Sequence, residues 1–201
     1  MMENKMNRTF LLPALLLVLL WIAASAAAQN SAVAPSTAQP AAAPSAPTQT
    51  KNPVSSALRD ALPGRQKNTI AAVEAMPADK FSYKPTPDQI TFGHLVAHMV
   101  EANYLLCSKS AGVAAPKVDE VKDTDPKDKL VPALKASFDF CADTLAKMDD
   151  SNLGETTVGF GGQPYSRARF AIGLATNWAD HYAEAAMYLR LNGILPPTAK
   201  K

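Results

Sequence analysis

The sequence has almost no excess of charge of one sign, and this excludes two classes of partner. It carries 20 Lys and Arg against 18 Asp and Glu, a formal net charge of +2. A chain that binds nucleic acid or an anionic membrane surface through its charge needs a clear basic excess, so we expect neither partner. Strand-forming runs of useful length and internal repeats are also missing. The 47% hydrophobic and 19% charged residues are typical of one globular domain.

Residues 1–28 have the composition of a secretory signal peptide. Lys5 and Arg8 precede a long apolar run, and three alanines before Gln29 fit the small-residue cleavage rule. No cysteine stands at the cleavage point, which argues against a lipoprotein. An uncleaved membrane anchor is the alternative, because residues 10–28 approach the roughly 20 needed to span a bilayer. Cleavage is favoured, and it predicts a periplasmic or extracellular protein with no stable membrane span.

Residues 29–52 consist almost entirely of Ala, Ser, Pro, Thr and Gln, with prolines at spacings that no helix or strand tolerates. Such a segment has too little apolar bulk to offset the entropy of ordering it. We therefore expect a disordered linker that joins the signal peptide to a single domain over residues 53–201.

The periodicity of apolar residues in this domain is helical throughout. Amphipathic helices are expected at about residues 54–75, 92–111, 130–149 and 167–191. Thr91 is a candidate N-cap and Gly193 a candidate C-cap, while Pro63-Gly64 predicts an interruption of the first helix. The glycine-rich residues 151–164 predict at most a short extended turn. Four such helices bury their apolar stripes best as an all-α four-helix bundle, and the long loops after the first two permit a topology other than up-down-up-down.

The two cysteines, Cys107 and Cys141, lie on the second and third predicted helices. In an exported protein they can persist as a disulfide, whereas in the cytosol the same pair would be two buried thiols. The sequence leaves open whether the cysteines form a disulfide or remain two thiols, since it does not give the distance between the two Cα atoms.

All three histidines lie on predicted helices. His94 and His98 are four residues apart, so they project from one helix face, and His181 lies on the apolar side of the last helix. This pattern suits the ligands of one divalent ion, although ordinary hydrogen-bonded histidines would give the same pattern. Glu101 and Glu184 each follow a histidine by three residues, where a carboxylate can orient the imidazole. Their order is the reverse of the Glu-x-x-His motif of di-iron bundles, which disfavours a di-iron site.

Three segments carry a family resemblance: TFGHLVAHMVEANYLLCS, SFDFCADTLAKM and HYAEAAMYLRLNGILPP. They resemble the corresponding helices of DinB-family proteins, and the resemblance covers about residues 55–197. It implies a four-helix bundle in which three histidines bind a divalent metal, zinc or nickel. The family's ligand positions fall on His98, Asn177 and His181, so one ligand histidine is replaced by asparagine here.

The replacement at Asn177 sets the functional alternatives. An amide oxygen is a poor substitute for imidazole toward borderline-soft ions, and His94 is a candidate replacement ligand. An altered metal site could support hydrolase or thiol S-transferase chemistry, with Glu101 or Glu184 as proton acceptor. The competing interpretation is a non-catalytic module with a degenerate metal site that binds a small molecule or a protein. Whether the protein is an enzyme stays open, and a homodimer is a further option.

Overall fold

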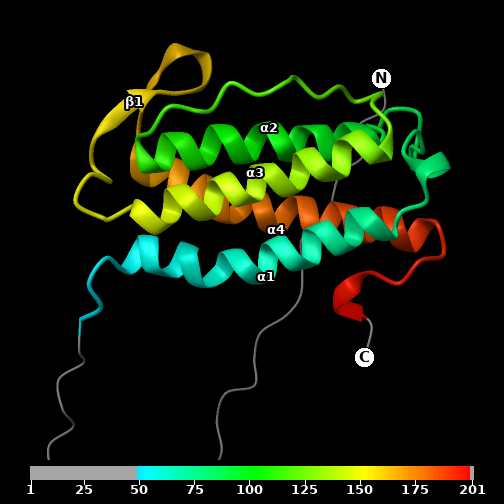
Figure 1. Cartoon of the computed structure of the whole chain (residues 1–201), viewed down its shortest axis with the longest axis horizontal. Coiled ribbons are helices and arrows are strands. Elements are labelled where there is room, and N and C mark those ends of the chain that lie inside the picture. Colours follow the sequence, from blue (N-terminus) through cyan, green and yellow to red (C-terminus); the bar gives the residue numbers. More distant parts are fainter. Residues whose placement is uncertain (1–48, 200–201) are drawn as a thin grey trace, which may run out of the picture. The chain divides into compact units, whose positions relative to one another are not determined.

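The computed structural model describes residues 49–199. The predicted signal peptide and most of the predicted linker lie outside them. Four long helices account for most of the domain (Figure 1). Their bounds are α1 Pro53–Ala75, α2 Phe92–Ala111, α3 Lys127–Lys147 and α4 Arg167–Leu191. Short 3-10 turns lie at η1 Ala78–Lys80, η2 Phe160–Gly162 and η3 Pro197–Ala199.

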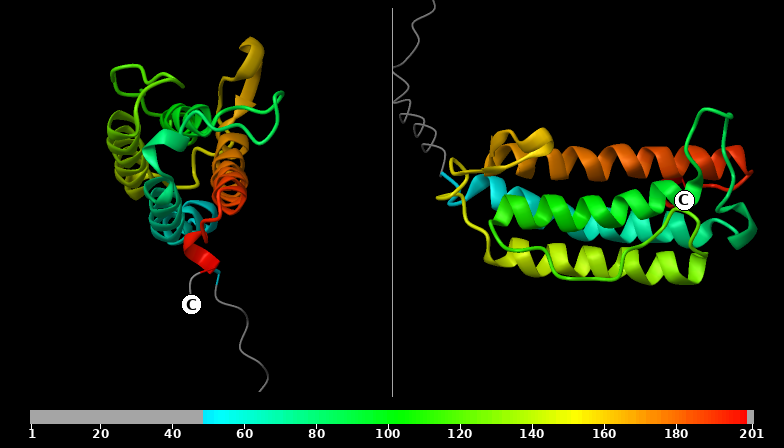
Figure 2. Two further views of the ribbon diagram at one scale, coloured as in Figure 1. Left: turned by 90° about the vertical axis from the view of Figure 1, so that its right-hand side faces the viewer. Right: turned by 90° about the horizontal axis from the view of Figure 1, so that it is seen from above.

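The helices form a bundle in which α1 and α2 lie diagonally opposite each other. Both α1 and α2 pack against α3 and against α4, as the view along the bundle in Figure 2 shows. Because α2 and α3 run in the same direction, residues 112–126 between them travel the length of the bundle (Figure 1). We call residues 112–126 the strap. The topology is therefore up-down-down-up, as the long loops permitted.

The first helix is continuous, so the predicted interruption at Pro63-Gly64 is wrong. Proline removes one intrahelical hydrogen bond, but Pro63 and Gly64 are both exposed, where water can replace the lost partner. The predicted caps are confirmed. Thr91 Oγ1 accepts from the N–H of His94 at 3.0 Å, and Gly193 follows α4 with a left-handed φ of 73°.

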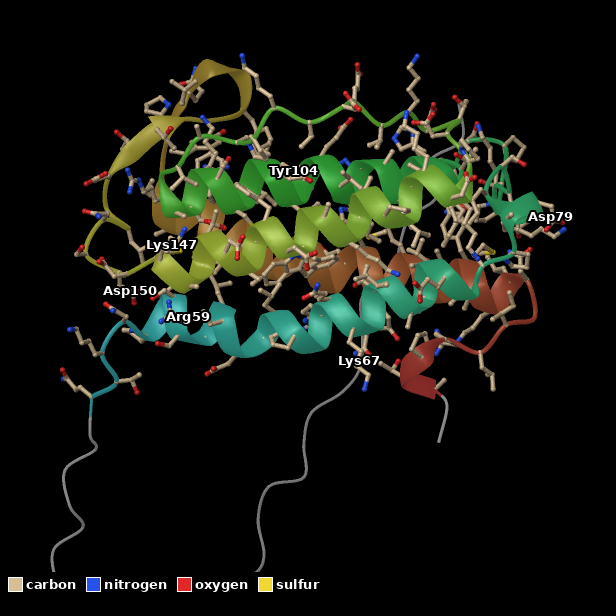
Figure 3. The ribbon with its side chains drawn as sticks, in the orientation of Figure 1. Arg59, Lys67, Asp79, Tyr104, Lys147 and Asp150 are labelled. Carbon is tan, nitrogen blue, oxygen red and sulfur yellow. A yellow bond between two sulfur atoms is a disulfide. The ribbon has the colours of Figure 1, made fainter. Side chains whose placement is uncertain are left out.

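At one end of the bundle, α1 and α3 cap each other. Asp150, just after α3, accepts hydrogen bonds from the first N–H groups of α1, those of Val54 at 2.7 Å and Ser55 at 2.9 Å. Arg59 Nη1 donates to the carbonyls of Leu145 and Met148 at the end of α3, both at 2.9 Å. Figure 3 shows Asp150 and Arg59 at this end. These contacts satisfy backbone groups that lack partners inside a helix.

At the opposite end of the bundle, a side chain of α3 likewise caps the end of α1. Lys127 Nζ, in the first turn of α3, donates to the carbonyls of Glu74 at 2.6 Å and Met76 at 2.8 Å, where α1 ends. A cation near the C-terminal carbonyls of a helix is favoured by the helix dipole. The antiparallel pair α1 and α3 is thus fixed in register at both ends.

Cys107 on α2 and Cys141 on α3 form a disulfide, with a Cα–Cα distance of 5.3 Å. Both cysteines are fully buried in the core. The core around them is mostly aliphatic and aromatic; its largest fully buried members include Phe92, Phe138, Leu95, Leu130, Leu134, Leu145, Leu174 and Leu189. Of the two interpretations that the sequence allowed, the structure adopts the disulfide.

Between α3 and α4 the chain forms a small antiparallel hairpin of β1 Thr156–Val158 and β2 Pro164–Ser166. These strands of 3 residues each are the short extended turn that the glycine-rich segment predicted. In the part of the chain that the structure describes, no helix combines the length and the apolar character needed to cross a membrane.

Candidate functional site

The imidazole rings of His98 on α2 and His181 on α4 lie in contact. Their centroids are 4.8 Å apart and their planes are nearly perpendicular, at 87°. The contact follows from the helical periodicity, because each histidine occupies the side of its helix that faces the other across the α2–α4 packing interface. The structure thus brings together two of the four residues predicted as metal ligands.

A carboxylate holds one of the two rings in place. Glu184, one turn after His181 on α4, lies with its Oε2 atom 2.7 Å from His181 Nδ1. The side chain of His181 is 17% exposed, and that of Glu184 is 46% exposed. A partner on Nδ1 fixes the orientation of the ring and favours the tautomer that carries the proton there. Nε2 is then the nitrogen of His181 with a free lone pair.

The surroundings of the second ring, that of His98, lower its pKa. Partial removal of the His98 imidazole from water lowers its pKa below the usual 6.5, and the nearby His181 lowers it further. Glu101 and Glu184 act in the opposite direction, but the net shift is downward. A lowered pKa favours the unprotonated ring, which is the form able to accept a proton or bind a metal.

His94 faces the strap. Its Nδ1 lies 3.6 Å from Oδ2 of Asp123, and its side chain is 48% exposed. Between α2 and the strap is a cleft of about 290 Å³. The cleft is lined by His94, Ala97, His98 and Glu101 from α2 and by Glu120, Val121, Lys122 and Asp123 from the strap. One part of the His98 side chain therefore faces the cleft, and another part contacts His181.

Asn177 lies one turn before His181 on α4 and is half-buried. Both residues face a narrow interior void, too tight for a water molecule, that all four helices line. Its walls are Thr69 from α1, Met99 and Asn103 from α2, Phe138 from α3 and Asn177, Trp178 and His181 from α4.

A hydrogen-bonded network crosses the core beside this void. Trp178 Nε1 donates to Oδ1 of Asn103 at 2.9 Å, and Asn103 Nδ2 donates to Oγ of Ser137 at 3.0 Å. All three residues are buried. The network joins α2, α3 and α4 at one level, so it fixes the height at which Asn177 and His181 stand opposite His98.

The donors determine which ion the site fits. Among residues 49–199, no three His, Cys, Asp or Glu side chains are gathered so as to hold an ion together. A catalytic zinc centre of three such ligands is therefore not a fit. The remaining donors are the two contacting imidazoles of His98 and His181 and the amide of Asn177, a residue that lies one turn before His181 on α4. This set fits a divalent ion bound by two nitrogens and one oxygen, and more weakly than three histidines would bind it.

Comparison with known proteins identifies the fold family. A model of the DinB superfamily matches residues 61–185, more than half of the chain. The chain belongs to the DinB superfamily. A DinB-like protein from Bacillus subtilis has a similar structure with a TM-score of 0.57 and 18% identity, over 72% of this chain and 99% of the other. Another, from Bacillus cereus, has a TM-score of 0.56 and 16% identity, over 69% and 92% of the two chains.

The solved DinB-like structures establish the fold alone at these identities. No match is found among curated proteins. Within this DinB bundle, sequence reasoning predicted the histidines and Asn177 but missed Thr69, which shares the interior void with Asn177. A lone threonine on an amphipathic helix gives no signal in the sequence. It became visible only when the packing placed it against α4.

Proposed function

We propose that this protein is an exported DinB domain that binds a divalent transition-metal ion through His98 and His181, with Asn177 Oδ1 as the third ligand. The observation that carries the proposal is the contact of the two imidazole rings at 4.8 Å, one of them held by Glu184. Two helices that do not adjoin in the chain supply these rings. His98 is exposed and the Glu184 side chain is 46% exposed, so the contact lies at the edge of the bundle, where a bound ion would be open to solvent.

The surroundings of the rings support metal binding. Histidine ligands usually donate their second ring N–H to a carboxylate, as Glu184 allows for His181. Ligands must also be unprotonated, and the lowered pKa of His98 favours that form. Zinc and nickel are the candidate ions, because both accept imidazole nitrogen together with oxygen.

The cleft between α2 and the strap gives a small molecule access to His98. When bound, the ion would supply Lewis acidity and lower the pKa of a coordinated water or thiol, as hydrolysis or thiol S-transfer requires. Glu101 lines the cleft one turn after His98 and is the candidate proton acceptor. Glu184 is bound to His181 and orients that ring instead.

A specific observation favours a second candidate function, a non-catalytic binding module. Asn177 supplies a neutral amide where an imidazole would bind zinc much more strongly. If the ion binds too weakly to be retained, the cleft of about 290 Å³ still offers a polar pocket for a small molecule. Metal content separates the two functions.

The test is the metal content of the whole chain, purified without an affinity histidine tag and equilibrated with zinc or nickel. We expect near-stoichiometric metal, its loss in a His98→Ala, His181→Ala double variant, and tighter binding by orders of magnitude in Asn177→His. His94→Ala is the matched control, because His94 lies one turn from His98 but faces Asp123. Parent protein that stays metal-free under these conditions would leave the binding module as the function.

Export rests on the composition of residues 1–28 and is tested separately. We expect the mature protein, recovered from the periplasm or medium of a bacterial host, to begin at or near Gln29 by N-terminal sequencing. Recovery of the intact chain in the membrane fraction would identify the segment as an anchor instead.

A further inference from the structure

One buried hydroxyl in the core has no hydrogen-bond partner. Thr69, on α1, is 2% exposed, and its Oγ1 is the single fully buried side-chain nitrogen or oxygen atom within residues 49–199 that makes no hydrogen bond. Buried polar groups are almost always paired, because leaving one unpaired destabilises the folded state. An unpaired hydroxyl at such a position suggests that it gains a hydrogen-bond partner in another state of the protein, such as a ligand-bound state.

The void that Thr69 lines contains few candidates for that partner. The amide of Asn103 is engaged at both ends, by Trp178 at Oδ1 and by Ser137 at Nδ2, and Nδ1 of His181 is bound to Glu184. The void is too tight for a water molecule, so water does not satisfy the hydroxyl. Two other polar groups remain on its walls, Nε2 of His181 and the amide of Asn177. Nε2 is the atom with which His181 would bind the proposed ion, so the amide of Asn177 is the partner left for the hydroxyl.

We propose that Thr69 is a positioning residue for the metal site, an inference that rests on the proposed function. Its Oγ1 accepts a hydrogen bond from Nδ2 of Asn177 when an ion is bound, which turns Oδ1 of the same amide toward the ion. An asparagine amide has one end that donates and one that accepts. Fixing the donor end on α1 therefore selects the orientation in which the oxygen can act as a ligand.

The proposal gives Thr69 two opposite effects. In the metal-free protein its unpaired hydroxyl destabilises the fold, so Thr69→Val, which has nearly the same shape, should raise Tm by about 2–4 °C. In the metal-bound protein the hydroxyl holds a ligand, so the same variant should bind metal about tenfold more weakly, as is common when a partner of a ligand is removed. A purely structural role for Thr69 would not combine a gain in Tm with a loss of affinity.

The experiment measures Tm without metal and the Kd for Zn²⁺ and Co²⁺ in the whole chain, by calorimetry and by the visible absorption of bound Co²⁺. The variants are Thr69→Val, Thr69→Ser, Asn177→Ala, the combination of Thr69→Val with Asn177→Ala, and the His98→Ala, His181→Ala double variant. Thr69→Ser keeps the hydroxyl and should bind within about twofold of the parent. In the Asn177→Ala background, Thr69→Val should change the Kd no further, since the ligand that it positions is gone.

The outcomes separate this inference from the proposed function. If the double histidine variant loses binding but Thr69→Val binds like the parent, the metal site stands and the role of Thr69 is overturned. The role is also overturned if Thr69→Val weakens binding equally with and without Asn177. If the double histidine variant binds as well as the parent, the metal site itself is wrong, and the inference falls with it.

Discussion

The indole N–H of Trp178 donates a hydrogen bond to the side-chain oxygen of Asn103 at 2.9 Å. Trp178 follows Asn177 directly in α4, and His181 lies one turn further on. Asn103 likewise lies on α2 a little more than one turn after His98. The bond therefore fixes the two helices that carry the candidate metal ligands at the height where the imidazole rings meet.

Asn103→Leu tests this bond. The substitution leaves Trp178 Nε1 buried without an acceptor, so we expect a loss of about 1–3 kcal/mol in the free energy of unfolding. Trp178→Phe removes the donor as well. The Asn103→Leu, Trp178→Phe double variant should therefore lose less stability than the sum of the losses in the two single variants, as measured by urea denaturation. Strictly additive losses would show that the hydrogen bond contributes nothing beyond the packing of the two side chains.

Gly93→Ala tests how the strap is seated. A Cβ atom on Gly93 would lie 2.5 Å from the backbone oxygen of Asp123 and 3.3 Å from that of Phe81. The strap or the segment before α2 must therefore move. We expect a loss of about 1–3 kcal/mol in stability and faster hydrogen exchange in residues 120–123.

The matched control is Gly64→Ala on α1, where an added Cβ atom meets no other atom within 4 Å. Alanine is the better helix former, so this variant should gain about 0.5–1 kcal/mol. Similar losses in both variants would mean that contact with the strap is not the reason for glycine at position 93.

The disulfide between Cys107 and Cys141 should contribute substantially to stability. It closes a loop with a sequence separation of 34 residues, for which the restriction of the unfolded chain amounts to about 3–4 kcal/mol. We expect the Cys107→Ala, Cys141→Ala double variant to unfold at markedly lower urea concentration. Both cysteines are buried, so the folded parent should resist mild reduction and yield two thiols only after denaturation. Two thiols titrated in the parent as isolated from an oxidising compartment would contradict this prediction.

Asp150→Asn tests the cap at the start of α1 and its pH dependence. Burial raises the pKa of the Asp150 carboxyl. The N–H groups of Ser55 and Val54, the Ser55 hydroxyl and the charge of Arg59 together lower it more, so the net pKa lies below the ordinary 3.8. A carboxyl with a lowered pKa stabilises the folded state above its unfolded pKa, and this contribution is lost as the pH falls through the folded value.

Parent and Asp150→Asn should therefore differ by about 0.3–1 kcal/mol in the free energy of unfolding at pH 7. The difference should shrink below pH 4, when the parent carboxyl also becomes neutral. Urea denaturation at both pH values measures it. Asp60→Asn, at an exposed position on α1, is the control for the change in net charge. A difference that persists unchanged at pH 2.5 would show that the charge of Asp150 is not what stabilises the cap.

The sequence predicts the helices well because each leaves a local signal. Apolar periodicity locates the four helices, and Thr91 and Gly193 mark two of their ends, because caps depend on residues within one turn. The interruption predicted at Pro63 is wrong because the effect of a proline on a helix is not purely local. Its effect depends on whether the proline lies on the exposed side of the helix, and that side is set by packing rather than by local preference.

The candidate site is only partly predictable. His98 and His181 could be paired from the sequence through the family resemblance, but their contact depends on which helices adjoin in the bundle. The separation of His94, which turns to Asp123, depends on the path of the strap. Thr69 could not be found at all, because its significance comes from the absence of a hydrogen bond in the assembled core.

The disulfide and the strap together determine how the domain would respond to a protease. The strap contains Lys117 and Lys122, both exposed, and it is the connection between the half of the domain that holds α1 and α2 and the half that holds α3 and α4. Trypsin cleavage there would leave the two halves covalently joined through Cys107 and Cys141. The nicked protein would therefore run as one band without reductant and as two bands with it. Each fragment would carry one of the two contacting histidines.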